Sequence, residues 1–130
     1  MGTGYEIVCE SCGNRDSFML GFGMLWHPKE IMLERLRPRR REQVEAILAS
    51  NLGADLDIQN RLYLCGHCGR PAVRMCVNVS DQTKVLYDSQ FRCGKCRKPL
   101  VEADIQDVLD RPCWVCGRAA LVEAGVILWD

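Results

Sequence analysis

The stretch Cys65-Gly66-His67-Cys68 and three others of the same form are the strongest structural signals in this chain. The others are Cys9-Glu10-Ser11-Cys12, Cys93-Gly94-Lys95-Cys96 and Cys113-Trp114-Val115-Cys116. Two cysteines separated by two residues can both point inward from one tight turn, here called a knuckle, and supply half of a tetrahedral metal site. Four knuckles complete two four-cysteine sites with no ligand left over. We therefore predict two structural zinc ions held by these eight cysteines.

The residue after each knuckle carries a second signal. Gly13, Gly69 and Gly117 directly follow the second cysteine of three knuckles. The backbone often needs a positive φ there, which glycine adopts without strain. The third knuckle departs from this pattern, because Arg97 follows Cys96 and the glycine lies inside the turn, at Gly94.

The cysteine count points to a reducing compartment. Nine cysteines occur in 130 residues, an odd number, and eight of them sit in knuckles. The N-terminal stretch Met1-Gly2-Thr3-Gly4-Tyr5-Glu6 does not have the basic and then apolar pattern of a secretory signal. No apolar run approaches the roughly 18 residues that would span a bilayer. We expect a cytoplasmic protein with metal sites instead of disulfides and with no membrane partner.

Other uses of cysteine fit this sequence less well than structural zinc does. Iron is the alternative metal, above all in a heterologous host, because rubredoxin-type sites use the same ligands. A redox pair would need a βαβ setting around one motif. A catalytic zinc keeps an open coordination position, whereas both sites here can be filled by sulfur. No Ser-His-Asp set, nucleophile elbow or phosphate loop occurs, so we expect no enzyme and no small-molecule substrate.

A strand, a knuckle and a second strand recur four times along the chain. The expected strands cover residues 5–8, 17–22, 60–64, 71–79, 84–87, 100–101 and 120–129. A helical insertion at about 28–52 separates the first two knuckles, with a break near Arg37 caused by Pro38. Asp104 is expected to cap a short helix. The predicted fold class is a small, metal-stapled α+β protein made of zinc-ribbon or rubredoxin-like β-hairpins with a helical insertion.

Two pairings of the knuckles are compatible with the spacing. The sequential pairing joins the first knuckle with the second and the third with the fourth. The nested pairing joins the second with the third and leaves the first and last to close the other site. We favour the sequential pairing, because each half of the chain then contains a strand and a knuckle followed by a helix and a second knuckle. It predicts a first zinc-ribbon half over residues 1–70 and a second over 71–130, in one compact unit.

Three single residues are assigned ordinary roles. Cys76 lies in an alternating stretch and is expected to fill the core, as free cysteine commonly does. His67 is expected to be an exposed loop residue, because four sulfurs already complete its site. His27 precedes Pro28 and is expected at a helix entry.

The segment Tyr5-Glu6-Ile7-Val8-Cys9-Glu10-Ser11-Cys12-Gly13, followed by Phe18-Met19-Leu20-Gly21-Phe22-Gly23-Met24-Leu25, resembles the opening of uncharacterised bacterial zinc-ribbon proteins. The likeness extends, in order of elements, over a helical insertion, later knuckles and an ending like Leu128-Trp129-Asp130. It implies a rubredoxin-like or zinc-ribbon fold with structural zinc, and it implies no activity.

The remaining features favour a macromolecule-binding module. A protein partner is our first interpretation. A helical face with Met24, Leu25, Trp26, Ile31 and Met32 offers a docking surface, although apolar residues of this kind belong more often to the core than to an interface. Nucleic acid is the alternative, because five arginines fall within residues 35–41. These are Arg35, Arg37, Arg39, Arg40 and Arg41. The formal net charge is zero, and each filled four-thiolate site would add −2, so the basic run stands in a mildly acidic protein.

Overall fold

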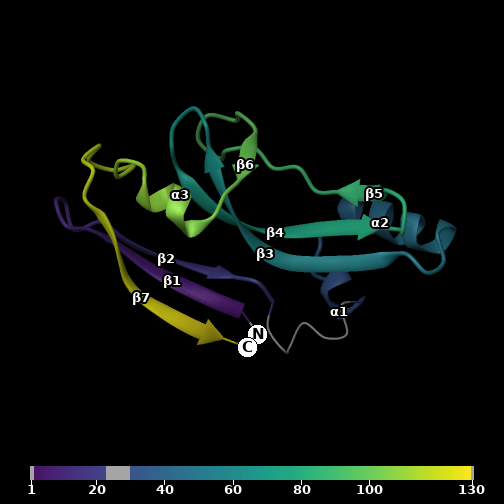
Figure 1. The fold of residues 1–130 in the computed structure, drawn as a ribbon. Helices are drawn as coiled ribbons and strands as arrows, with labels where there is room; N and C mark the ends of the chain where they lie inside the picture. Colours follow the sequence, from purple (N-terminus) through teal and green to yellow (C-terminus); the bar gives the residue numbers. More distant parts are fainter. Residues whose placement is uncertain (1, 23–29, 130) are drawn as a thin grey trace.

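The computed structural model describes residues 2–22 and 30–129, and its strands form two antiparallel sheets (Figure 1). The first sheet has the order β2-β1-β7, from Arg15–Leu20, Gly2–Cys9 and Leu121–Trp129. Its central strand β1 pairs with the last strand of the chain, from Gly2↔Trp129 to Cys9↔Leu121. The two ends of the chain therefore lie side by side.

The second sheet has the order β5-β4-β3-β6. Its strands are β3 (Asp55–Cys65), β4 (Pro71–Ser80), β5 (Val85–Asp88) and β6 (Leu100–Glu102). Strands β3 and β4 form a long hairpin, from Asp55↔Ser80 to Leu64↔Pro71. The expected boundary at residue 70 falls inside the turn of this hairpin. The first sheet thus combines strands from the two ends of the chain, and the second sheet contains the strands from its middle.

The helical insertion forms two helices against the second sheet. Helix α1 spans Glu30–Leu33, and α2 spans Pro38–Ser50. The predicted break near Arg37 is present, because Pro38 takes the first position of α2, where its missing N–H costs no hydrogen bond. Val44 of α2 is fully buried and packs with Met32 against Ile58 of β3. The helix entry expected at His27 and Pro28 lies outside the described residues.

A second core lies between the two sheets. Ile7 and Phe18 of the first sheet pack with Leu62 of β3. Val108 joins them from helix α3 (Ile105–Leu109). As predicted, Asp104 caps α3, in a reciprocal arrangement with Asp107.

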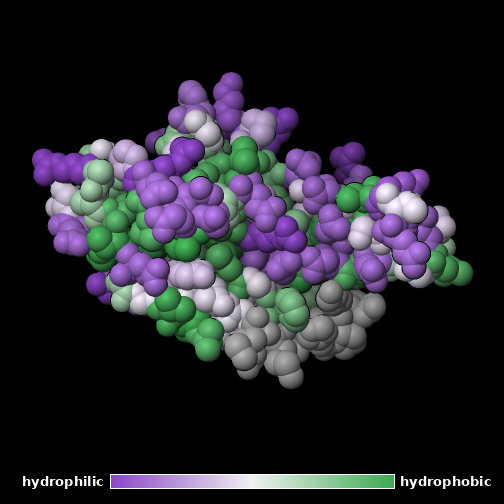
Figure 2. Space-filling model, viewed as in Figure 1, coloured by the Kyte–Doolittle hydropathy of each residue, from purple (hydrophilic) through white to green (hydrophobic). Residues whose placement is uncertain are grey.

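The outer surface of β7 is apolar near the C-terminal end. Figure 2 shows hydrophobic residues gathered over the end of this strand. Val126, Ile127 and Leu128 are the exposed residues concerned. In the described part of the chain, no helix is long and apolar enough to cross a membrane.

Candidate metal centres

All four knuckles share one backbone geometry. In each, the N–H that follows the second cysteine donates to the carbonyl of the first cysteine, over 2.8–2.9 Å. The N–H of the first cysteine donates in turn to the carbonyl five residues on, over 2.7–3.1 Å. The donor and acceptor pairs of this second bond are Cys9–Asn14, Cys65–Arg70, Cys93–Lys98 and Cys113–Arg118. These bonds fold each turn back on itself, so that both of its sulfurs face the same side.

The residue after the second cysteine adopts a left-handed backbone in every knuckle. Its φ is 78° at Gly13, 72° at Gly69 and 76° at Gly117. Arg97 takes the same position in the third knuckle with a φ of 62°. A side chain in this region clashes with its own backbone and costs about 1–2 kcal/mol. The third knuckle therefore keeps the common shape at a local energetic cost that the others avoid.

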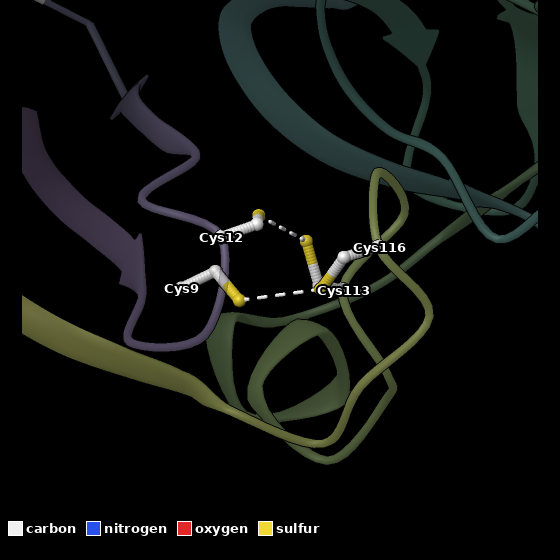
Figure 3. A group of neighbouring side chains, drawn as sticks. All are labelled: Cys9, Cys12, Cys113 and Cys116. Atoms are coloured by element: carbon white, nitrogen blue, oxygen red, sulfur yellow. Dashed lines mark hydrogen bonds between the residues drawn. The ribbon is translucent and has the colours of Figure 1, made fainter.

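The knuckles meet in two groups of four cysteines. The outer cluster contains Cys9, Cys12, Cys113 and Cys116, and the inner cluster contains Cys65, Cys68, Cys93 and Cys96. Figure 3 shows the outer cluster, in which the knuckle between β1 and β2 faces the one between α3 and β7. The ligand atoms within each group all lie within 4.8 Å of one another.

The spacing of the sulfurs fits a tetrahedral ion. Sγ pairs that face each other across two knuckles are 3.6 and 3.8 Å apart in the outer cluster and 3.3 and 3.5 Å apart in the inner cluster. A disulfide would bring two sulfurs to about 2.05 Å. Four sulfurs at about 2.3 Å from a central ion would lie about 3.8 Å from each other. Each cluster thus has the donor set and the size to hold one metal ion.

The sequential pairing of the knuckles is wrong, and the nested pairing is observed. Strand pairing is the reason. Cys9 ends β1 beside Leu121 of β7, which brings the first knuckle to the fourth. Cys65 ends β3 beside Leu100 of β6, which brings the second knuckle to the third. Both spacings suit a metal site, so the choice depended on sheet partners far apart in the sequence.

The first cysteine of each knuckle has a lowered pKa. Backbone N–H groups of Cys96 and Lys95 point at Cys93 and lower the pKa of its thiol to about 6. Burial raises the pKa of Cys113, but the N–H groups of Cys116 and Val115 outweigh it and bring the value to about 6. The pKa of Cys9 and of Cys65 is lowered in the same way, by the N–H of Cys12 and of Cys68.

The pKa is raised at Cys12, Cys68 and Cys96, the second cysteines of the first three knuckles. The N–H of Asn14 favours the thiolate of Cys12, but burial and the neighbouring sulfurs raise its pKa to about 11. Cys96 follows the same pattern, with the N–H of Lys98 opposed by burial and by Cys65, and its pKa is raised to about 11. Four thiolates cannot share so small a space unless a cation compensates their charge, and a bound metal would deprotonate all of them.

The other residues singled out in the sequence lie apart from these clusters. Cys76 is buried, as expected, and the hydroxyl of Ser89 donates to its Sγ over 3.7 Å. His67 is exposed in its knuckle and belongs to neither ligand group. Met32 is 1% exposed and belongs to the core, which is where apolar residues of this helical face were more expected to lie, whereas Ile31 is exposed. Met24, Leu25 and Trp26 of that face lie outside the described residues.

No family model, no curated protein and no solved structure matches this chain. The class of protein is therefore defined by the fold and the clusters alone. It is a small α+β metal-binding module with two tetra-cysteine centres. Some residues that carry the resemblance to zinc-ribbon proteins, namely Gly23, Met24, Leu25 and Asp130, lie outside the described part.

Proposed function

We propose that this chain is a zinc-ribbon protein in which both clusters hold structural zinc and the folded frame serves to bind a macromolecule. The observation that carries the proposal is that each site is complete, since among the described residues four cysteine sulfurs and no other potential ligand group form each cluster. Sets of four thiolates suit zinc or iron. Zinc is preferred because four thiolates in paired knuckles are typical of structural zinc.

A structural role follows from the coordination. A catalytic zinc typically has three protein ligands and an open position for water or substrate. Here each cluster offers four sulfurs, and among the described residues no histidine or carboxylate joins them. The ions would instead stabilise the fold, because zinc binding in such sites contributes about 10–16 kcal/mol of apparent free energy.

Two surfaces are candidates for the partner. The exposed apolar residues of β7, at the edge of the first sheet, favour a protein partner. The arginines around α2 favour nucleic acid. The arginine-rich surface around α2 is supported by its charge and by its shape, so we place nucleic acid ahead of the protein partner expected from the sequence.

Metal analysis of the purified chain tests the zinc frame. We expect two zinc ions for each chain by elemental analysis, matching the two clusters. Replacement by Co²⁺ should give the absorption bands of tetrahedral sulfur coordination at both sites. Exhaustive chelation should abolish the dispersed amide signals of the folded protein. A chain that keeps its fold without metal, or that shows hydrolytic turnover with zinc bound, would contradict the proposal.

A further inference from the structure

A groove of about 630 Å³ lies between the start of α2 on one side and β4, β5 and the segment after β5 on the other. Six arginines line it, namely Arg35, Arg37, Arg39, Arg40, Arg74 and Arg92. The first four precede or open α2, Arg74 belongs to β4, and Arg92 follows β5. The tertiary structure thus adds two arginines from distant positions to the basic run seen in the sequence.

The positive charge of this groove is not compensated by the protein. Among residues 2–22 and 30–129, none of the six arginines forms an ion pair, whereas Arg41 pairs with Glu45 and Arg61 with Asp57 and Glu102. No carboxylate of the described residues lines the groove. The nearest acidic residues in sequence, Glu34, Glu42 and Asp88, are exposed and lie outside the lining. An anionic ligand would therefore meet unpaired guanidinium groups.

The start of α2 strengthens this field. No side chain caps the helix at Arg37, and its first turn contains no acidic residue. A helix N-terminus carries a partial positive charge that favours acidic side chains and disfavours basic ones. Arg39 and Arg40 stand there nonetheless. Their positive charges oppose the partial charge of the helix end, and a bound anion would offset this repulsion.

Aromatic rings lie among the arginines. Phe91 and Tyr87 both line the groove. The guanidinium of Arg40 lies 5.1 Å from the centroid of the Phe91 ring. That ring is held edge-on by Tyr63, with centroids 5.3 Å apart. Flat guanidinium and aromatic groups are the surfaces on which unpaired bases stack.

We propose that this groove binds single-stranded nucleic acid, with the arginines on the phosphates and bases stacked at Phe91 and Arg40. This inference rests on the proposed function and names the partner of the zinc frame. A concave surface suits a flexible strand with exposed bases, whereas a duplex presents its bases within grooves that protruding elements enter. An acidic or phosphorylated peptide could use the arginines but would leave the stacking surface without a role.

The test is fluorescence anisotropy of the zinc-loaded protein with labelled oligothymidylate and oligouridylate of about 12 nucleotides, a length typical of single-strand sites. The matching duplex and a phosphopeptide are the competing probes. If about five phosphates are contacted, the affinity should fall about 100-fold between about 50 and 200 mM salt. Zinc content is measured for every sample, so that loss of the metal frame is distinguished from loss of the groove.

Two variants of equal charge separate the groove from general electrostatics. The groove variant carries Arg39→Gln, Arg74→Gln and Arg92→Gln. The control variant carries Arg15→Gln, Arg111→Gln and Arg118→Gln, all exposed and outside the groove. We expect the groove variant to bind at least about 10-fold more weakly, with a slope of log affinity against log salt reduced by about 2. The control should stay within about threefold of the parent protein.

Phe91→Leu tests the stacking separately. It keeps an apolar residue against Tyr63 and should weaken the binding of single strands about fivefold or more, without changing the salt dependence. The inference is overturned if both triple variants weaken equally, if the duplex or the phosphopeptide binds more tightly than single strands, or if zinc-loaded protein binds no oligonucleotide. If the protein contains no zinc but still binds single strands, the proposal of structural zinc is wrong and the proposal of a nucleic-acid groove is retained.

Discussion

The Sγ atoms of Cys9 and Cys116 lie 3.6 Å apart, although 107 positions separate the two residues. A metal at the outer cluster therefore fastens the first knuckle to the last and encloses the inner cluster in the loop between them. A covalent cross-link that closes a loop of about 100 residues stabilises a protein by about 4–5 kcal/mol in the chain-entropy description. A metal ion that joins two segments equally far apart in the sequence also stabilises the folded state, because it too restricts the unfolded chain.

Paired substitutions should reveal the nested arrangement. Cys9→Ser with Cys116→Ser removes two ligands of one site, so we expect the loss of one zinc ion and retention of the other. Cys9→Ser with Cys65→Ser damages both sites, so we expect the loss of both. Elemental analysis after gel filtration measures the difference. The reverse result would restore the sequential pairing.

Arg97→Gly should stabilise the protein. The substitution removes the cost of a side chain at a φ of 62°, partly offset by the greater freedom of glycine in the unfolded chain. We expect a gain of about 0.5–1 kcal/mol in the free energy of unfolding of the zinc-loaded protein, measured with denaturant.

Two glycine substitutions serve as controls for Arg97→Gly. Gly69→Ala introduces a side chain at a φ of 72° and should cost about 1 kcal/mol or more. Gly66→Ala lies at an open position with no such backbone strain and should change little. Equal effects at positions 66 and 69 would show that backbone strain does not govern the knuckle.

Acid should release zinc from both clusters. A lowered pKa keeps Cys93 and Cys113 in the thiolate form down to about pH 6, so the form that binds metal is present above that pH. Below about 6 even these thiols take up protons and compete with the ion. A coloured chelator should therefore report release that steepens below this pH. Full retention of zinc well below it would argue against thiolate coordination.

Cys76→Ser should be far milder than substitution of any clustered cysteine. Cys76 is buried and contacts the Ser89 hydroxyl but no metal site. Placing a second hydroxyl there should cost about 1 kcal/mol, or about 3–6 °C in Tm, with both zinc ions retained. Cys93→Ser should lose one ion and destabilise the protein by several kcal/mol. Similar Tm values for the two variants would contradict this distinction.

Asp104→Ala should weaken the short helix before the fourth knuckle. The Asp104 carboxylate accepts the N–H of Asp107 over 2.9 Å, and the Asp107 carboxylate accepts the N–H of Asp104 over 3.0 Å. Loss of such a cap costs about 1 kcal/mol. Asp104→Ser retains a capping oxygen and should recover most of this stability in chemical denaturation. Identical losses in both variants would show that the side-chain cap contributes nothing.

Local elements could be predicted because their signals are local. The cysteine pairs predicted the knuckles, Pro38 predicted the break before α2, and Asp104 predicted the cap of α3. The basic run at residues 35–41 could be recognised in the sequence. Its proximity to Arg74 and Arg92 could not, because it depends on the position of β4 and of the segment after β5 beside α2.

That eight cysteines form four turns able to hold metal follows from the sequence, since each turn is built from contacts within a few residues. Which turns share a site depends instead on the packing of the whole chain. β1 pairs with β7 and β3 with β6, and these long-range pairings depend on how apolar faces such as those of Ile7 and Leu62 are buried together. Spacing along the chain carries no record of that choice, because a flexible loop of either length closes at nearly the same entropic cost.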